Sequence, residues 1–109
     1  MVKSVRGSRT GRPIMVLLDL LGRRWTLRVL WELRDGPLSS RALRTACDDV
    51  SPTVLQTRTA ELRTAGLLQL RAGEGYELTE LGKELMTAFA PLNRFAASWA
   101  DQQQSGPPQ

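Results

Sequence analysis

The sequence predicts a mainly α-helical domain with one small β-hairpin, an α+β chain in the order of a winged helix-turn-helix. Two observations carry this prediction. Residues 51–66 begin with Ser51 and Pro52, a cap followed by a first helical residue, and read as a helix that ends at Gly66. Two short apolar segments, 67–71 and 76–78, then flank a glycine-containing turn, and Thr79 begins another helix. We therefore expect one helix and one hairpin side by side on the surface.

Length and charge predict one domain with two short extensions. The chain has 109 residues, enough for a modest core, and a net charge of +4. Four basic residues and no acid lie in the first twelve positions, which leaves 11 basic and 11 acidic residues in a neutral remainder. We expect residues 1–12 to be a disordered basic arm, 13–101 the folded domain and 102–109 a disordered tail. The arm could follow DNA phosphates or enter a minor groove, but a plain disordered terminus with Gly and Ser is the favoured interpretation.

The composition argues against catalysis and metal binding. The chain has no histidine and one cysteine, Cys47, which removes disulfides, Cys/His zinc sites and histidine-based catalysis. The pair Asp48-Asp49 falls where a turn is expected and fits a capping feature better than a metal site. We predict no enzyme activity, no metal and no cofactor. The longest apolar run, 14–18, is far shorter than the roughly 20 residues of a membrane span, so we predict a cytoplasmic protein without membrane contact.

The first two predicted helices lie on either side of Gly22. Pro13 can open the first, and residues 14–21 are apolar on nearly every side, so the helix needs a cover on all faces. A chain this short has little to cover it with, which favours a dimer. In the second helix, Leu27, Leu30 and Trp31 form an apolar stripe, with Val29 and Leu33 flanking it, and Gly36-Pro37 stops the helix. Leu38-Ser39 is a candidate short strand.

The next two helices form the predicted helix-turn-helix. Ser39 or Ser40 can cap a helix over 41–47, with Leu43, Ala46 and Cys47 on its inner face. In the helix after Pro52, spacing places Leu55, Thr59 and Leu62 inward. The opposite face is polar and suited to reading base edges; it carries Thr53, Gln56, Thr57, Ala60 and Thr64.

The last helix carries a long apolar stripe, interrupted at Pro91, which should kink or divide it. Such a stripe at the end of a small domain also favours dimerisation. Trp31, Phe89 and Trp99 are expected in the core or the dimer seam, and a ligand pocket at their junction is the less favoured alternative. The predicted seam consists of Ile14, Leu17, Leu18, Leu21, Phe89, Leu92, Phe95 and Trp99.

Several short motifs, in order, resemble the HxlR-type winged-helix transcription regulators, relatives of the MarR group. The resemblance covers roughly residues 13–100, and its most specific parts are the start and the end. The matching segments are Leu20-Leu21-Gly22-Arg23-Arg24-Trp25-Thr26-Leu27, Leu30-Trp31-Glu32-Leu33, Gly36-Pro37, Ser51-Pro52 with Leu55, Arg58 and Leu62, Gly66-Leu67, and Tyr76-Glu77-Leu78-Thr79-Glu80-Leu81-Gly82.

The resemblance implies a homodimer that binds double-stranded DNA at a near-palindromic operator, as a repressor, with the helix over about 52–65 in the major groove. A small-molecule effector is compatible with it. The implied base-reading segment carries Ser51, Thr53, Gln56, Thr57 and Arg58, and the implied phosphate contacts are Arg23, Arg24, Ser40, Arg41 and, at the base of the hairpin, Arg71. An alternative is a winged-helix module that binds a protein partner, since the neutral body attracts DNA weakly.

Three positions depart from the family pattern. Arg12 stands before Pro13, where several redox-sensing members carry a cysteine, which excludes thiol sensing by that route. The turn between the strands is only Ala72-Gly73-Glu74-Gly75, shorter than is usual in the family. Thr59 occupies a position that is usually leucine. Cys47 itself is expected to be a small buried hydrophobic residue.

Overall fold

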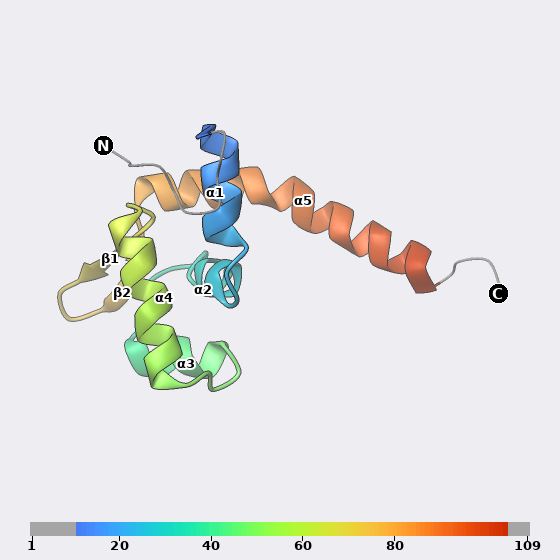
Figure 1. The fold of residues 1–109 in the computed structure, drawn as a ribbon. Helices are drawn as coiled ribbons and strands as arrows, with labels where there is room; N and C mark the ends of the chain where they lie inside the picture. Colours follow the sequence, from blue (N-terminus) through green and yellow to red (C-terminus); the bar gives the residue numbers. More distant parts are fainter. Residues whose placement is uncertain (1–10, 105–109) are drawn as a thin grey trace.

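The computed structural model describes residues 11–104, which form five helices and one antiparallel hairpin that lies at the edge of the molecule, beside α4 (Figure 1). The predicted class, mainly α with a small β-hairpin, is confirmed. The helices are α1 (Pro13–Leu21), α2 (Thr26–Glu32), α3 (Ser40–Ala46), α4 (Pro52–Thr64) and α5 (Glu80–Gln104), and the strands are β1 (Leu68–Arg71) and β2 (Gly75–Leu78).

Side-chain caps fix the starts of α3 and α4, the helix-turn-helix pair. The Ser39 hydroxyl accepts a hydrogen bond from the Ala42 backbone N–H at 3.0 Å, and Ser51 accepts one from that of Val54 at 3.1 Å. Ser39 rather than Ser40 is therefore the cap of α3. Asp48 and Asp49 form the turn, both with a left-handed backbone (φ 58° and 57°), and the described residues contain no cluster of side chains that could hold a metal ion.

The core is centred on α2 and α4. Val29 and Leu30 of α2, and Leu33 just after it, are at most 1% exposed, whereas Leu27 and Trp31 are partly buried against the core. The predicted stripe therefore faces the core, but the flanking positions Val29 and Leu33 are buried more deeply than Leu27 and Trp31, because α1, α3, α4 and α5 all pack near this short helix. The prediction for α4 is confirmed, since its inward positions Leu55, Thr59 and Leu62 are all buried. Each fully buried leucine contributes about 1.5–3 kcal/mol to folding.

The hairpin, or wing, pairs Leu68 with Leu78 and Arg71 with Gly75. Leu38 joins its edge through two backbone hydrogen bonds with Tyr76, at 2.9 and 3.0 Å, so the candidate strand at 38–39 is reduced to one bridging residue. Gly75 has a φ of +99°, and a Cβ there would collide with the Leu38 carbonyl. Only glycine allows the wing to approach the start of α3 this closely.

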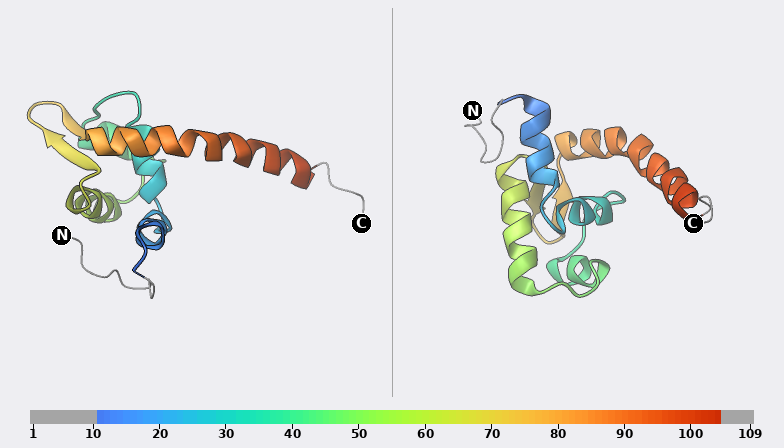
Figure 2. Two further views of the ribbon diagram at one scale, coloured as in Figure 1. Left: turned by 90° about the horizontal axis from the view of Figure 1, so that it is seen from above. Right: turned by 45° about the vertical axis from the view of Figure 1, so that its right-hand side comes forward.

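α5 begins at a cap and runs further than predicted. The Thr79 hydroxyl accepts a hydrogen bond from the Gly82 N–H at 3.0 Å. Pro91 lies inside one continuous helix and does not divide it, and the helix changes direction along its length (Figures 1 and 2). The tail prediction is wrong for residues 102–104, which are helical to Gln104, because glutamine favours helix and no Gly or Pro stops the helix before Gly106.

α1 and the far half of α5 leave large apolar side chains exposed. No residue of α1 is buried, and Ile14 and Leu18 are 56% and 52% exposed. Figure 2 shows α5 projecting from the body, which gives the molecule extents of 53 × 36 × 25 Å. No described helix is long and apolar enough to cross a membrane. Of the predicted arm only Gly11 and Arg12 are described, and the Arg12 carbonyl accepts the Met15 and Val16 N–H groups; the rest of the arm and residues 105–109 of the tail lie outside the described residues.

Candidate nucleic-acid interface

The outer face of α4 is the polar surface that the sequence predicted. Thr53, Gln56 and Thr57 are exposed on it, and the wing follows directly in the chain (Figure 1). No bulky apolar side chain lies on this face, because Leu55, Thr59 and Leu62 turn inward. A helix with a short-chained polar face and a fixed start has the dimensions to enter a major groove.

The polar side chains on this face differ in how many hydrogen-bond donors and acceptors they have left for a bound molecule. Thr57 donates its hydroxyl to the Thr53 carbonyl at 3.0 Å, which leaves its oxygen free to accept and its methyl group outward. Ser51 uses its hydroxyl oxygen as the helix cap and keeps a donor. Among residues 11–104, no group forms a hydrogen bond with the side-chain amide of Gln56. Gln56 therefore has both a donor and an acceptor available, the pair that recognises adenine.

Arg58, which the resemblance places in the base-reading segment, does not lie on the outer face of α4. Its Nε donates to the Arg24 carbonyl at 2.8 Å, and its Nη1 donates to Glu61 Oε1 at 2.7 Å. Its side chain is only 22% exposed. The structure holds Arg58 against the body of the domain, on the side of α4 that faces the junction between α1 and α2.

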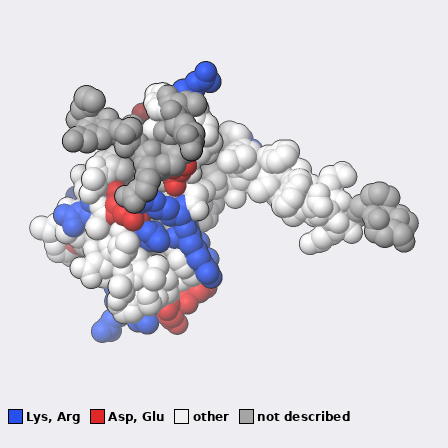
Figure 3. Space-filling model, in the orientation of Figure 1, with Lys and Arg blue, Asp and Glu red and all other residues white. Residues whose placement is uncertain are grey.

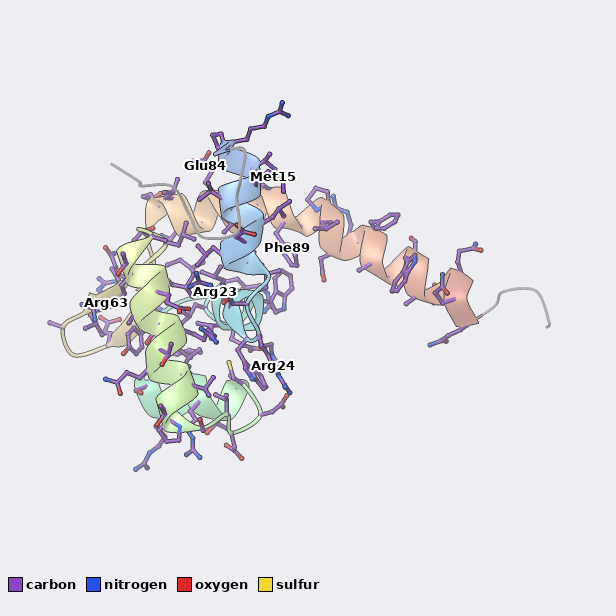
Figure 4. The ribbon with its side chains drawn as sticks, viewed as in Figure 1. Met15, Arg23, Arg24, Arg63, Glu84 and Phe89 are labelled. Atoms are coloured by element: carbon purple, nitrogen blue, oxygen red, sulfur yellow. The ribbon has the colours of Figure 1, made fainter. Side chains whose placement is uncertain are left out.

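The two arginines at that junction have different surroundings. Arg23 forms an ion pair with Glu61 at 3.0 Å, whereas Arg24 lies over the ring of Trp25, 5.8 Å from its centroid. In Figure 4, Arg23 is drawn beside α4 and Arg24 farther from it. Arg23 is thus paired with Glu61 at the surface, with its side chain 41% exposed, and of the two only Arg24 keeps a guanidinium without a carboxylate partner among the described residues.

The remaining predicted contacts also divide into free and engaged groups. Ser40 and Arg41 are exposed at the start of α3, with no side-chain partner in the described part of the chain. Arg71, at the base of the wing, is paired with Glu77 at 3.2 Å and Glu74 at 3.7 Å. The hydrogen bond from Gln69 is the main cause that lowers the pKa of Glu77; Arg71 adds to it, and both outweigh desolvation. Arg71 is therefore largely neutralised by its own hairpin.

One exposed cation was missed by the sequence reasoning. Arg63 lies on α4 at the same helical side as Gln56 and Ala60, is exposed, and has no ion-pair partner within residues 11–104. Figure 4 draws it on the side of α4 where the wing lies. Its spacing of seven residues from Gln56 was the signal in the sequence, since seven residues return to nearly the same helix face.

Charges on this surface are mixed. Figure 3 shows basic atoms close beside acidic ones on the face seen in Figure 1, without one continuous basic surface. Glu61 accounts for part of this pattern because it lies between Arg23 and Arg58. The described body therefore attracts a phosphate backbone through a few separate cations rather than through a broad field.

Cys47 is fully buried at the end of α3, as predicted. Desolvation raises the pKa of its thiol to about 11, although Arg28 acts in the opposite direction. A thiol that stays protonated at neutral pH is a poor nucleophile and a poor redox sensor.

The predicted seam residues are only partly free. Leu21 and Phe89 pack against the protein's own core, and Phe89 meets Trp31 edge to face at 5.7 Å; Leu17 is half-buried. The others are more than half exposed, which makes them available to another surface: Ile14, Leu18, Leu92, Phe95 and Trp99.

An open groove of about 630 Å³ lies between the end of α2 and α5. Trp31 and Met86 contribute apolar surface, and Arg34, Lys83 and Arg94 contribute positive charge. Of the aromatic residues considered for a ligand pocket, only Trp31 lines this groove, because Phe89 faces the core and Trp99 lies farther along α5.

The chain is similar to known transcription regulators over most of its length. It is 27% identical to the uncharacterized HTH-type transcriptional regulator sll1512 of Synechocystis sp., over 84% of this chain and 72% of that protein. The quinone-bound YodB of B. subtilis superposes with a TM-score of 0.69 and 28% identity, over 82% of this chain and 96% of YodB. A possible HxlR family transcriptional factor from Thermoplasma volcanium superposes with a TM-score of 0.73 and 26% identity, over 83% and 86% of the two chains.

A family model also matches residues 20–104, which include every element from α2 to the end of α5. Its description is HxlR-like helix-turn-helix. The predicted resemblance and the absence of an enzymatic role are confirmed by this family, whose members are DNA-binding regulators. The helix-turn-helix, the wing and the family match together show that this chain belongs to the HxlR-like helix-turn-helix family of transcriptional regulators.

Proposed function

We propose that the protein is a homodimeric repressor that binds a near-palindromic operator in double-stranded DNA, with α4 of each protomer in a major groove. The observation that carries the proposal is the outer face of α4, where Thr53, Gln56 and Thr57 are exposed beside the wing. Ser40, Arg41 and Arg24 are the proposed phosphate contacts, and Arg63 joins them. Ser51 contributes the donor that its capping role leaves free. Such a regulator would work in the cytoplasm.

Exposed apolar surface supports the homodimer. Phe95 and Trp99 are 61% and 56% exposed on the projecting half of α5, and Ile14 is 56% exposed on α1. Soluble monomers rarely expose so many large apolar side chains in neighbouring positions. A second copy that covers α1 and α5 would bury them and would place two copies of α4 on one side of the dimer.

A small-molecule effector is also part of the proposal. YodB, a structural neighbour, has been solved with a quinone bound. Here the fully buried Cys47 offers no accessible thiol, so an effector would bind without a covalent bond. The groove with Trp31, Arg34 and Arg94 adjoins α5, where a bound molecule would shift one protomer against the other.

The direct test of base reading is the double variant Gln56→Ala/Thr57→Ala. We expect it to bind operator DNA about tenfold or more weakly, because each good base contact is worth about 1–3 kcal/mol, while binding to scrambled DNA is unchanged. Fluorescence anisotropy with labelled DNA from upstream of the gene, and with a scrambled duplex, measures both affinities at two salt concentrations.

A matched control is Thr87→Ala/Gln102→Ala on α5. Thr87 also donates its hydroxyl to a carbonyl four residues earlier, at 3.2 Å, so the two pairs make similar chemical changes. If the α4 variant binds the operator as the wild type does, the recognition face is misassigned. If wild-type binding shows no sequence preference and little salt dependence, the alternative of a protein-interaction module replaces the proposal.

A further inference from the structure

A polar network joins the middle of α4 to the junction between α1 and α2. Arg58 donates in two directions, to the Arg24 carbonyl at 2.8 Å and to Glu61 Oε1 at 2.7 Å. Glu61 Oε2 in turn pairs with Arg23 Nη1 at 3.0 Å. The three side chains therefore make two connections from one turn of α4 to two consecutive residues of the junction. We call Arg23, Arg58 and Glu61, with the Arg24 carbonyl, the polar clamp.

The polar clamp is better ordered by its surroundings than an ordinary surface ion pair. The side chains of Arg58 and Glu61 are 22% and 28% exposed, whereas Lys83 and Glu80 in a surface pair are 62% and 93% exposed. Desolvation raises the pKa of Glu61, but the hydrogen bonds and charges of Arg58 and Arg23 outweigh it and hold that pKa below 4.5. Glu61 is thus charged at neutral pH and uses both carboxylate oxygens.

The junction between α1 and α2, to which the polar clamp bonds, has little conformational freedom. The connection between α1 and α2 is short, because only residues 22–25 separate the two helices. Trp25 adopts a left-handed backbone with φ 77°, which is rare for a bulky residue and persists only where the surroundings impose it. A displacement of α1 therefore moves residues 22–25 with it, and the polar clamp transmits this movement to α4.

From these observations we propose that Arg58 and Glu61 are positioning residues that set the angle of α4 relative to α1, and hence the spacing of the two recognition helices in a dimer. The inference rests on the proposed function, since spacing matters only if two copies bind one duplex. α1 carries the exposed apolar face of the proposed seam, and α4 carries the base-reading face. The clamp is the polar connection between these two elements.

A positioning role and a DNA-contact role predict opposite results when Glu61 loses its charge. If Arg23 and Arg58 were phosphate ligands held back by Glu61, then Glu61→Gln would release them and tighten binding to every duplex. If they position α4, then Glu61→Gln loosens the helix and weakens binding only where the spacing of two half-sites must be met. The sign of the change in specific affinity decides between the two roles.

Arg58→Lys makes the same test without a change in charge. A lysine keeps the positive charge but is a single ammonium group, which cannot span the carbonyl and the carboxylate as the planar guanidinium does. Glu32→Gln is the matched control, because Glu32 pairs with Arg28 at 2.8 Å, is 24% exposed and has no hydrogen bond or ion pair with α4, while Arg28 keeps its separate bonds to Asp48 and to the Ala46 carbonyl. It makes the same charge change as Glu61→Gln.

The experiment uses the full chain and the duplex that the wild type selects from a random-sequence library. Anisotropy gives the affinity for that duplex, for a scrambled duplex, and for versions with one base pair added or removed between the half-sites. We expect Glu61→Gln and Arg58→Lys to lower the ratio of specific to scrambled affinity about five- to tenfold, the net effect of one ordinary hydrogen bond. Both should also discriminate less between spacings, with the wild-type salt slope kept. Glu32→Gln should keep the wild-type ratio.

Three outcomes would overturn the inference. If Glu61→Gln bound the specific and the scrambled duplex equally more tightly, the effect would be one of charge. If Arg58→Lys kept the wild-type ratio of specific to scrambled affinity, the two-directional hydrogen bonding of the Arg58 guanidinium would not be needed. A fall in the salt slope of about 0.9 in Arg58→Gln would make Arg58 a phosphate ligand. Binding is compared where circular dichroism shows every variant folded. A wild-type chain that selects no sequence would instead refute the proposed function, before the clamp is tested.

Discussion

Cys47 shows how burial decides what a residue can do. Its side chain is completely enclosed, and burial raises its thiol pKa to about 11, above its ordinary value of 9.0. A group whose pKa is raised on folding contributes its stability below the unfolded pKa and loses it as pH rises toward the folded one. At pH 8 we therefore expect a stable, protonated and unreactive thiol.

Thiol labelling measures this directly. At pH 8 we expect an alkylating reagent to modify Cys47 at least about a hundredfold more slowly in the native protein than in denaturant, because reaction requires local opening and a thiolate. Cys47→Ser serves as the negative control, because it removes the one thiol of the chain. Equal rates in the two conditions would mean that the side chain is accessible.

Gly82 is a second residue whose role is set by space. It is buried in the first turn of α5, and a Cβ there would collide with the Leu67 carbonyl. We expect Gly82→Ala to lower the free energy of unfolding by about 1–3 kcal/mol, although alanine is the better helix former. Chemical denaturation measures the change. Ala97→Gly, at an exposed site of the same helix, gives the propensity effect alone, about 1 kcal/mol; a more stable Gly82→Ala would contradict the close packing.

Elements differ in how far the sequence predicted them. The starts of α3, α4 and α5 were predictable because Ser39, Ser51 and Thr79 act on backbone groups only three residues away. The inward face of α4 followed from spacing alone. The exposed face of α4 was therefore predictable for Thr53, Gln56 and Thr57, which only had to point away from the core.

The role of Arg58 was not predictable by the same reasoning. Its main partner, the Arg24 carbonyl, lies 34 residues away in the sequence, and no local pattern records such a contact. The deeper burial of Val29 and Leu33 compared with Leu27 and Trp31 has a similar origin, because several elements pack against this short helix at once. The end of α5 was predicted three residues too early, because the glutamines at 102–104 favour helix and no Gly or Pro stops it before Gly106.

At the scale of the whole molecule, the seam is the feature to test. We expect the wild type to sediment as a dimer at micromolar concentration and Phe95→Ser/Trp99→Ser as a monomer, because two large exposed apolar groups are removed from the proposed interface. Analytical ultracentrifugation measures the mass. Leu70→Ser, at a 52% exposed apolar site on the wing, should leave the mass unchanged. A wild type that stays monomeric would remove the basis for two-fold operator binding.

The bridge between Leu38 and Tyr76 has a consequence for the order of folding. Its two hydrogen bonds join positions on either side of α3 and α4. Bringing Leu38 and Tyr76 together costs conformational entropy as long as the chain between them is unfolded. Once α3 and α4 have formed and packed, the two residues are already close, so we expect the bridge to form late. The wing would then act as a latch: it docks onto the start of α3 only after the helix-turn-helix has assembled. A nascent chain would thus lack a complete reading surface until synthesis had passed the hairpin.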